Sequence, residues 1–336
     1  MRKALLIVAL LAASDAFADS KERIAQGIGL HELGRYDDAI AVFKSVLADE
    51  PANDDAAYEL AMSYMAKGDA AQCRAAIEPR LDHKTDLQAA MHAIAGNCLD
   101  MAGKTDEAIA TYRKGLAINA NETQILFNLA LTLAQHDQYD EARELLKKEL
   151  PLRPDHRTAR YVLAEIFSTQ NFRAPAVVEY LRFLSLEPSG PRAKEVAGKV
   201  LTLINAGVER KSEKETTITI DPNARTEEGD YGVWNMMMAV AGAAGNLPET
   251  KKLSEFERAQ SQLSDTIKMF AEANEAGSNY TTEHNLPFFV ALYDKKLVEA
   301  FAGVALTSLN LKGQDAWLKK NAKAVQSYQA FMAGQK

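Results

Sequence analysis

The chain has 336 residues, of which 47% are hydrophobic and 25% are charged, a balance typical of a globular protein that buries a core. Its formal net charge of −7 argues against a nucleic-acid partner, because such partners are bound largely by neutralising phosphates. Two cysteines are too few for a disulfide-stapled scaffold, and a chain of this length does not need one.

The first 18 residues have the features of a secretory signal peptide. Arg2 and Lys3 precede an apolar run over residues 4–13, and the small-residue site Ala16-Phe17-Ala18 follows. The run is too short to span a bilayer, and no later segment has about 18 uninterrupted apolar residues. The sequence therefore predicts cleavage after Ala18 and export, to the periplasm if the cell is bacterial, or secretion, with no membrane span afterwards. An uncleaved N-terminal anchor is the alternative.

The residues that follow repeat with a period of about 34. The segment Gly34-Arg35-Tyr36-Asp37-Asp38-Ala39 has a counterpart in Gly103-Lys104-Thr105-Asp106-Glu107-Ala108. A small residue after the acidic pair recurs at Ala39, Cys73, Ala108, Ala142 and Ala176. A second small residue recurs upstream of it at Gly27, Ala61, Gly96, Ala130 and Ala164. A fixed period of this length is typical of a repeat architecture.

This pattern resembles the tetratricopeptide repeat (TPR) family, whose 34-residue unit folds as two antiparallel helices. The resemblance covers residues 20–190 as five units, and it implies a right-handed helical superhelix. Two helices approach closely where both carry small side chains, which explains the recurring pairs. Gly34, Gly68 and Gly103 fit the short turns, because glycine accepts the left-handed conformation that ends a helix. A helix over 192–206 is predicted to cap the array.

The remaining third of the chain shows no repeat. A linker over 208–229 contains Thr216–Ile220, whose alternating β-branched residues predict a short extended segment. Hydrophobic spacing predicts a bundle of four helices, at 231–245, 252–275, 286–304 and 314–332. The predicted fold is all-α, with a signal peptide at 1–18, a repeat domain at 19–207 and a C-terminal helical domain at 230–336.

We find no motif that predicts catalysis, a cofactor or a metal. Gly103-Lys104-Thr105 imitates the end of a phosphate-binding loop, but Cys98 stands where that motif requires glycine. The six histidines are scattered, with no pair at ligand spacing. The best catalytic candidate is Asn279–Asn285, which concentrates polar and titratable groups, although a polar connection between helices is the ordinary explanation. We therefore expect a protein that is not an enzyme.

The resemblance implies a scaffold that binds a protein or peptide through the concave groove of the array. In this family the first helix of each unit lines that groove, and binding residues occupy fixed positions on it. The matching positions here are Ile24, Ile28, Tyr58, Met62, Met65, Phe127, Leu131 and Tyr161, with Ala93, Asn97 and Glu165 beside them. This lining is mostly apolar and has no basic cluster, so it suits an amphipathic helix or a hydrophobic extended peptide.

Three alternatives remain open. In the first, the protein is a secreted enzyme with an unrecognised site in its C-terminal helices. In the second, it is an accessory factor in envelope assembly or secretion. In the third, the C-terminal helices cover the apolar groove themselves.

The two cysteines are expected to meet. Cys73 lies on the second helix of one unit and Cys98 on the first helix of the next, and these helices are neighbours in the family. Export places the protein where thiols oxidise, so a disulfide between them is predicted. Two buried free thiols are the alternative.

Overall fold

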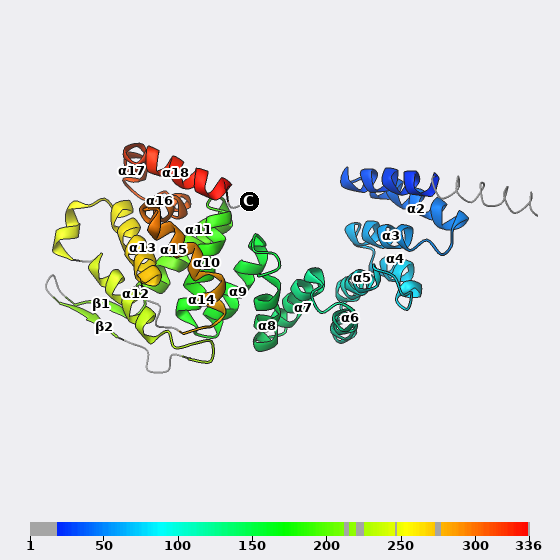
Figure 1. Cartoon of the computed structure of the whole chain (residues 1–336), viewed down its shortest axis with the longest axis horizontal. Helices are drawn as coiled ribbons and strands as arrows, with labels where there is room; N and C mark the ends of the chain where they lie inside the picture. The colour runs from blue at the N-terminus through cyan, green and yellow to red at the C-terminus, as the bar shows by residue number, and fades with distance from the viewer. Residues whose placement is uncertain (1–18, 212–214, 220–224, 246, 273–276, 335–336) are drawn as a thin grey trace, which may run out of the picture. The chain divides into compact units, whose positions relative to one another are not determined.

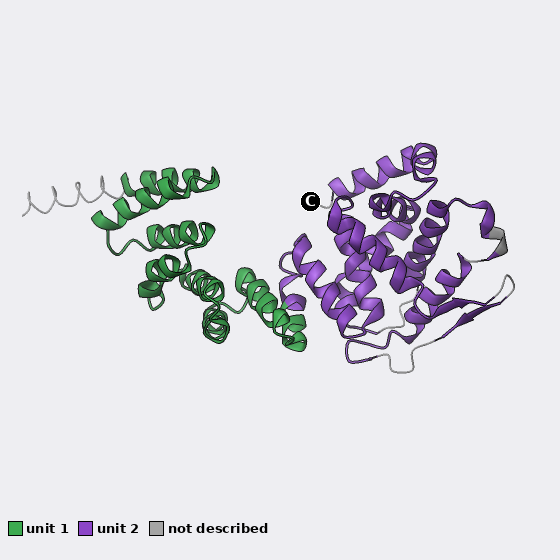
Figure 2. Cartoon of the chain, turned by 180° about the vertical axis from the view of Figure 1, so that it is seen from behind, with its two compact units in different colours: residues 1–145 green, residues 146–336 purple. Residues whose placement is uncertain are grey.

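The structure is a computed structural model, and apart from one short antiparallel sheet its described residues are helices and their connections (Figure 1). The predicted all-α fold is confirmed. The predicted signal peptide lies outside the described residues. The chain divides into two compact units, Met1–Leu145 and Leu146–Lys336 (Figure 2). The described residues are 19–211, 215–219, 225–245, 247–272 and 277–334.

Unit 1 is built from pairs of helices, as the repeat pattern predicts. The first helices of its pairs are residues 19–32, α3 (Asp54–Ala66), α5 (Gln88–Met101) and α7 (Thr123–Gln135). The second helices are α2 (Tyr36–Asp49), α4 (Ala70–Ile77), α6 (Thr105–Ile118) and α8 (Tyr139–Glu149), whose end belongs to unit 2. Consecutive first helices pack together, α3 against α5 and α5 against α7.

In all five repeats, the turn between the two helices has a residue with a left-handed backbone conformation at the same repeat position. Gly34, Gly68 and Gly103 have φ angles of +74°, +78° and +70°, which confirms the role predicted for them. Asp137 and Asn171 take the same position in the fourth and fifth repeats, with φ angles of +60° and +63°. Asp and Asn tolerate this conformation better than most residues. The turn therefore keeps its geometry where the glycine is not present.

An aromatic side chain from the second helix packs on the small residue of the first. A Cβ atom added to Gly96 would lie 2.3 Å from Cε1 of Tyr112, and one added to Gly27 would lie 2.4 Å from Cε1 of Phe43. Both aromatic side chains are buried. The glycine thus leaves room for a ring, and not only for a second small side chain as the sequence suggested.

A disulfide joins α4 to α5. Cys73 and Cys98 are buried in the core of unit 1, and their Cα atoms are 5.9 Å apart, within the range that a disulfide requires. The connection between these helices includes the 3-10 helix η1 (Glu78–Arg80) and lies where the repeat period lengthens to 35 residues. The disulfide therefore ties the second repeat to the third across this connection.

Unit 2 begins with the fifth repeat and a capping helix, α9 (Arg157–Thr169), α10 (Arg173–Leu186) and α11 (Pro191–Ile204). A hairpin follows, in which β1 (Val208–Arg210) pairs antiparallel with β2 (Thr216–Ile218). The C-terminal helices are α12 (Gly232–Ala244), η2 (Pro248–Lys252), α13 (Glu255–Glu272), α14 (Tyr280–His284), α15 (Leu286–Asp294), α16 (Val298–Ala305), η3 (Thr307–Leu309), α17 (Gln314–Lys320) and α18 (Ala322–Ala333).

The C-terminal helices differ from the four predicted. The helix expected over 286–304 is divided into α15 and α16, because Lys296 adopts a left-handed φ of +56° and ends the first of them. The helix expected over 314–332 is divided at Asn321. The strand expected over 216–220 ends at Ile218, and residue 220 lies outside the described residues. Its partner β1 was not predicted.

The fifth repeat and the C-terminal helices share one core. Helix α10 is buried along most of its length and contacts α12 and α16. Trp234 of α12 stacks on Phe270 of α13, with ring centroids 4.5 Å apart. Within unit 2 the C-terminal helices therefore pack on the second helix of the fifth repeat. That residues 19–207 fold as a separate domain stays a prediction.

Candidate partner-binding face

The first helices of unit 1 present a row of partly exposed side chains at equivalent repeat positions. We call this row the inner face. Its members are Ile28, Tyr58, Met62, Met65, Asn97, Phe127 and Leu131. Ile28 and three side chains of α3, those of Tyr58, Met62 and Met65, also pack against the buried core of the first repeats. This packing on the core holds them in place. Six of the seven members of the inner face are thus apolar, and four of these are supported by the core.

Ile24 does not belong to this face, which corrects the sequence-based assignment. Its side chain is only 9% exposed, and it belongs to the core cluster that includes Ile40 and Leu60. Ala93 is also fully buried. The repeat register therefore identifies the correct helices, but at the start of the array it places a core residue in the binding set.

Side-chain hydrogen bonds link neighbouring first helices. The Asn97 carbonyl oxygen accepts from Asn128 at 2.7 Å and from the Tyr112 hydroxyl at 2.6 Å, and its amide nitrogen lies 3.6 Å from the Met65 sulfur. The Thr132 hydroxyl donates to the Asp100 carboxylate. These bonds link α3, α5 and α7 side by side. They were not predicted, although the bonded polar residues lie 31 and 32 residues apart, close to the repeat period.

The electrostatic character of the inner face is acidic. Burial raises the pKa of the Tyr58 hydroxyl, and the carboxylates of Glu59 and Glu122 raise it further. Burial also raises the pKa of the Glu59 carboxyl, and the nearby Asp55 adds to this effect. Helices α3, α5 and α7 contain no lysine or arginine. An apolar row with acidic neighbours is the result.

Tyr161, the equivalent residue in unit 2, is in contact with charged side chains of its own unit. The cationic groups of Arg192 and Lys199 lie 5.2 Å and 5.6 Å from its ring centre, and its hydroxyl donates to Glu195 at 3.2 Å. Lys199 also contacts Glu165 at 2.6 Å. These three contacts come from the capping helix α11, and the Phe183 ring of α10 lies 6.0 Å from the Tyr161 ring.

The catalytic candidate 279–285 forms a structural junction. Asn279 and Thr282 form a capping box that starts α14, so the expected loop is partly helical. Asn285 is buried, accepts from Arg160 at 3.0 Å and donates to Glu179 at 2.7 Å. Arg160 and Glu179 form an ion pair of 2.9 Å, with exposed fractions of 3% and 0%. The polar residues therefore hold α14 against the fifth repeat.

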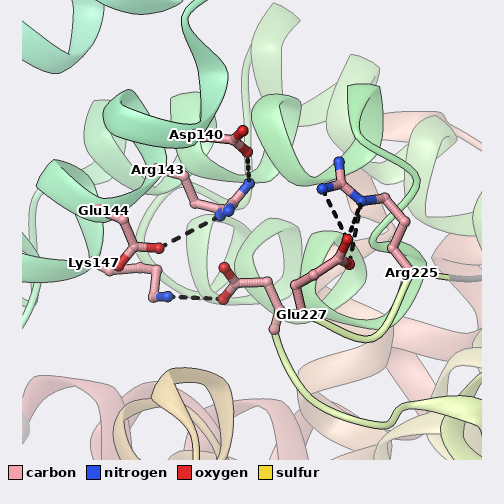
Figure 3. A network of polar contacts seen from close by, with 7 residues as sticks. Asp140, Arg143, Glu144, Lys147, Arg225 and Glu227 are labelled. Carbon is pink, nitrogen blue, oxygen red and sulfur yellow. Dashed lines mark hydrogen bonds and ion pairs between the residues drawn. The ribbon is translucent and has the colours of Figure 1, made fainter.

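Charged side chains around α8 are also paired (Figure 3). Arg143 contacts Asp140 at 2.9 Å, and Lys147 contacts Glu228 at 2.9 Å.

In the part of the chain that the structure describes, no group of three His, Cys, Asp or Glu side chains is placed to hold a metal ion. Over the same residues, no helix has the length and apolar character needed to cross a membrane.

A hollow of about 270 Å³ lies among α4, α5 and α6, away from the inner face residues. Three of its four charged lining residues are in ion pairs, since Arg74 pairs with Glu78 at 2.9 Å and Glu107 pairs with Lys104 at 2.7 Å. This hollow therefore offers a mixed surface and no convergent set of reactive groups.

Comparison with known proteins identifies the repeats. A family model described as tetratricopeptide repeat matches residues 30–98 and 101–166. Over the matched residues the repeats are therefore tetratricopeptide repeats, as the sequence pattern predicted. The family match does not extend to the C-terminal third. No curated protein matches the chain.

Several solved structures resemble part of this chain. The MamA protein is 21% identical, with a TM-score of 0.42 over 50% of this chain and 91% of that one. A thermophilic TPR protein of Thermus thermophilus is 19% identical, with a TM-score of 0.44 over 55% and 98%. PilF of Pseudomonas aeruginosa is 19% identical, with a TM-score of 0.49 over 56% and 82%.

Proposed function

We propose that this protein is an exported, non-catalytic scaffold that binds a protein or peptide through the inner face of unit 1. The observation that carries the proposal is the row of partly exposed, mainly apolar side chains on the first helices of unit 1. Tyr58 and Phe127 would be its anchors, because aromatic side chains contribute large contact areas at protein interfaces. The repeat family, whose members present extended concave surfaces, supports the same role.

The placement of the polar residues favours binding over catalysis. The segment proposed as a catalytic candidate from the sequence, Asn279–Asn285, caps a helix and bridges a buried ion pair. Its asparagines are therefore engaged in holding unit 2 together. A partner-binding role depends on the inner face and does not require the polar side chains of Asn279–Asn285 to react.

The test is capture of a partner from envelope extract by the mature protein, identified by mass spectrometry. The variant Tyr58→Ala/Phe127→Ala should lose the main partner, because both anchors are truncated. The matched control Leu33→Ala/Ile118→Ala removes two apolar side chains that are 74% and 47% exposed outside the inner face, and it should capture normally. Thermal melts verify that both variants are folded. Capture that survives loss of the anchors but disappears in high salt contradicts the proposal.

Export is the second part of the proposal, and the signal-like residues 1–18 support it. The Cys73–Cys98 disulfide fits an oxidising compartment. Intact mass of the protein isolated from cells, after alkylation without reductant, tests both features. We expect a chain that begins at Asp19 and has no alkylated cysteine. Two alkylated cysteines would exclude the disulfide, and a retained N-terminus would exclude cleavage.

A further inference from the structure

Negative charge is concentrated in the unit that contains the inner face. Residues 19–145 include 12 Lys and Arg but 22 Asp and Glu. Residues 146–336 are nearly balanced, with 25 Lys and Arg and 23 Asp and Glu. The overall charge of the chain is therefore a property of unit 1, where it attracts cations toward the repeat surface.

Within unit 1 the basic residues are unevenly placed, because three of the four first helices have none and residues 19–32 carry only Lys21 and Arg23. Each second helix carries at least one basic residue, among them Lys44, Arg74, Arg113 and Arg143. Helices α3, α5 and α7 carry none. A partner on the inner face would therefore meet carboxylates without neighbouring lysines or arginines from these three helices.

Two of these carboxylates lie beside Tyr58 and lack a cation. Asp55 and Glu59 are one helical turn apart on α3, where like charges repel each other. Among the described residues, neither makes an ion pair. Burial and Asp55 together raise the pKa of the Glu59 carboxyl, so a cation placed there would relieve an unfavourable charge. Glu122 adds a third carboxylate near Tyr58.

We infer that the partner segment is cationic and amphipathic, with apolar side chains on Tyr58, Met62 and Phe127 and with Lys or Arg toward Asp55 and Glu59. This inference rests on the proposed function and adds the chemistry of the partner. Met62 and Met65 suit such a segment, because methionine side chains adapt to varied apolar shapes. The long stems of Lys and Arg cover apolar surface while their charged ends reach the carboxylates.

The experiment measures binding of synthetic peptides to the mature full-length protein by fluorescence anisotropy. The probe is an amphipathic helical peptide of Leu and Lys. One control peptide has Glu in place of Lys, and the other has Ser in place of Leu. We expect the Leu/Lys peptide to bind at least about tenfold more tightly than either control, because only it combines both kinds of contact.

Variants then locate the contact. Asp55→Asn/Glu59→Gln should weaken the Leu/Lys peptide about fivefold, since two surface charge contacts are lost. Asp82→Asn/Asp86→Asn removes the same charge from exposed acids between α4 and α5 and should change binding less than about twofold. Tyr58→Ala/Phe127→Ala should weaken binding more than either pair.

The outcomes separate the inference from the proposed function. Equal binding of the Leu/Glu peptide, still lost on removing Tyr58 and Phe127, overturns the cationic partner and leaves the apolar inner face standing. Binding that depends on Asp55 and Glu59 but not on the aromatic pair overturns the apolar anchors instead. No binding of the Leu/Lys peptide, or equal effects of the two acid pairs, overturns the inference.

Discussion

Replacing Glu179 with alanine is expected to lower the free energy of unfolding by about 3–5 kcal/mol, because it leaves a buried charge without its partner. Arg160 is 3% exposed and has Glu179 as its only ion-pair partner among the described residues. Asn285 would lose an acceptor in the same substitution. Urea unfolding followed by circular dichroism measures the change.

An exposed ion pair provides the matched control for this substitution. Arg113 and Glu141 lie 2.8 Å apart, with exposed fractions of 54% and 43%. Glu141→Ala should therefore cost no more than about 1 kcal/mol. If Glu179→Ala costs as little as Glu141→Ala, the junction between the fifth repeat and α14 does not depend on the buried pair.

Gly96→Leu is expected to destabilise unit 1 by about 1–3 kcal/mol, the usual cost of overpacking a core. Even a Cβ at this position meets the Tyr112 ring at 2.3 Å, and Tyr112 is held by its hydrogen bond to Asn97. The ring or the helix must shift to admit a larger side chain. A thermal or urea melt reports the loss.

Gly29→Leu is the control, because a Cβ added there has no heavy atom within 4 Å other than those of its chain neighbours and of its own helix backbone. This substitution should be neutral or slightly stabilising, since leucine favours a helix by roughly 0.5–1 kcal/mol over glycine. A Gly96→Leu melt equal to that of the unmodified protein would mean that α5 and α6 do not pack closely at this glycine.

The repeat fold follows from the sequence because every unit repeats the same local requirements. Small residues at a period of about 34 residues and a glycine in three of the turns are visible in the residues themselves. Asp137 and Asn171 have left-handed backbone conformations at the repeat position that glycine has in the first three units. The repeat period therefore locates the turn even where glycine is missing. Nearest-neighbour packing then builds the array from these local features.

The C-terminal helices could not be derived in the same way, because this part of the chain has no repeat that marks where each helix ends. Lys296 and Asn321 divide predicted helices without a glycine or proline at the break. Asn285 finds its partner Arg160 at a separation of 125 residues. The strand β1 lies at the start of a charged stretch whose composition does not favour a strand.

The inner face was partly predictable, because side chains at equivalent repeat positions on the first helices tend to have the same orientation. Tyr58 and Phe127 are partly exposed where the family pattern places them, whereas Ile24 is a core residue. The hydrogen bonds from Asn128 and Thr132 to the preceding first helix depend on side-chain geometry. The cover of Tyr161 by α11 depends on the particular cations of that helix.

Site-specific photo-crosslinking in the producing cells tests most directly whether the inner face binds the partner. A benzoylphenylalanine is placed at Phe127 on α7 and, in a second strain, at Ile118, which is 47% exposed on α6. The proposed function predicts a crosslinked adduct from position 127 and none from position 118. An adduct from position 118 alone would contradict it.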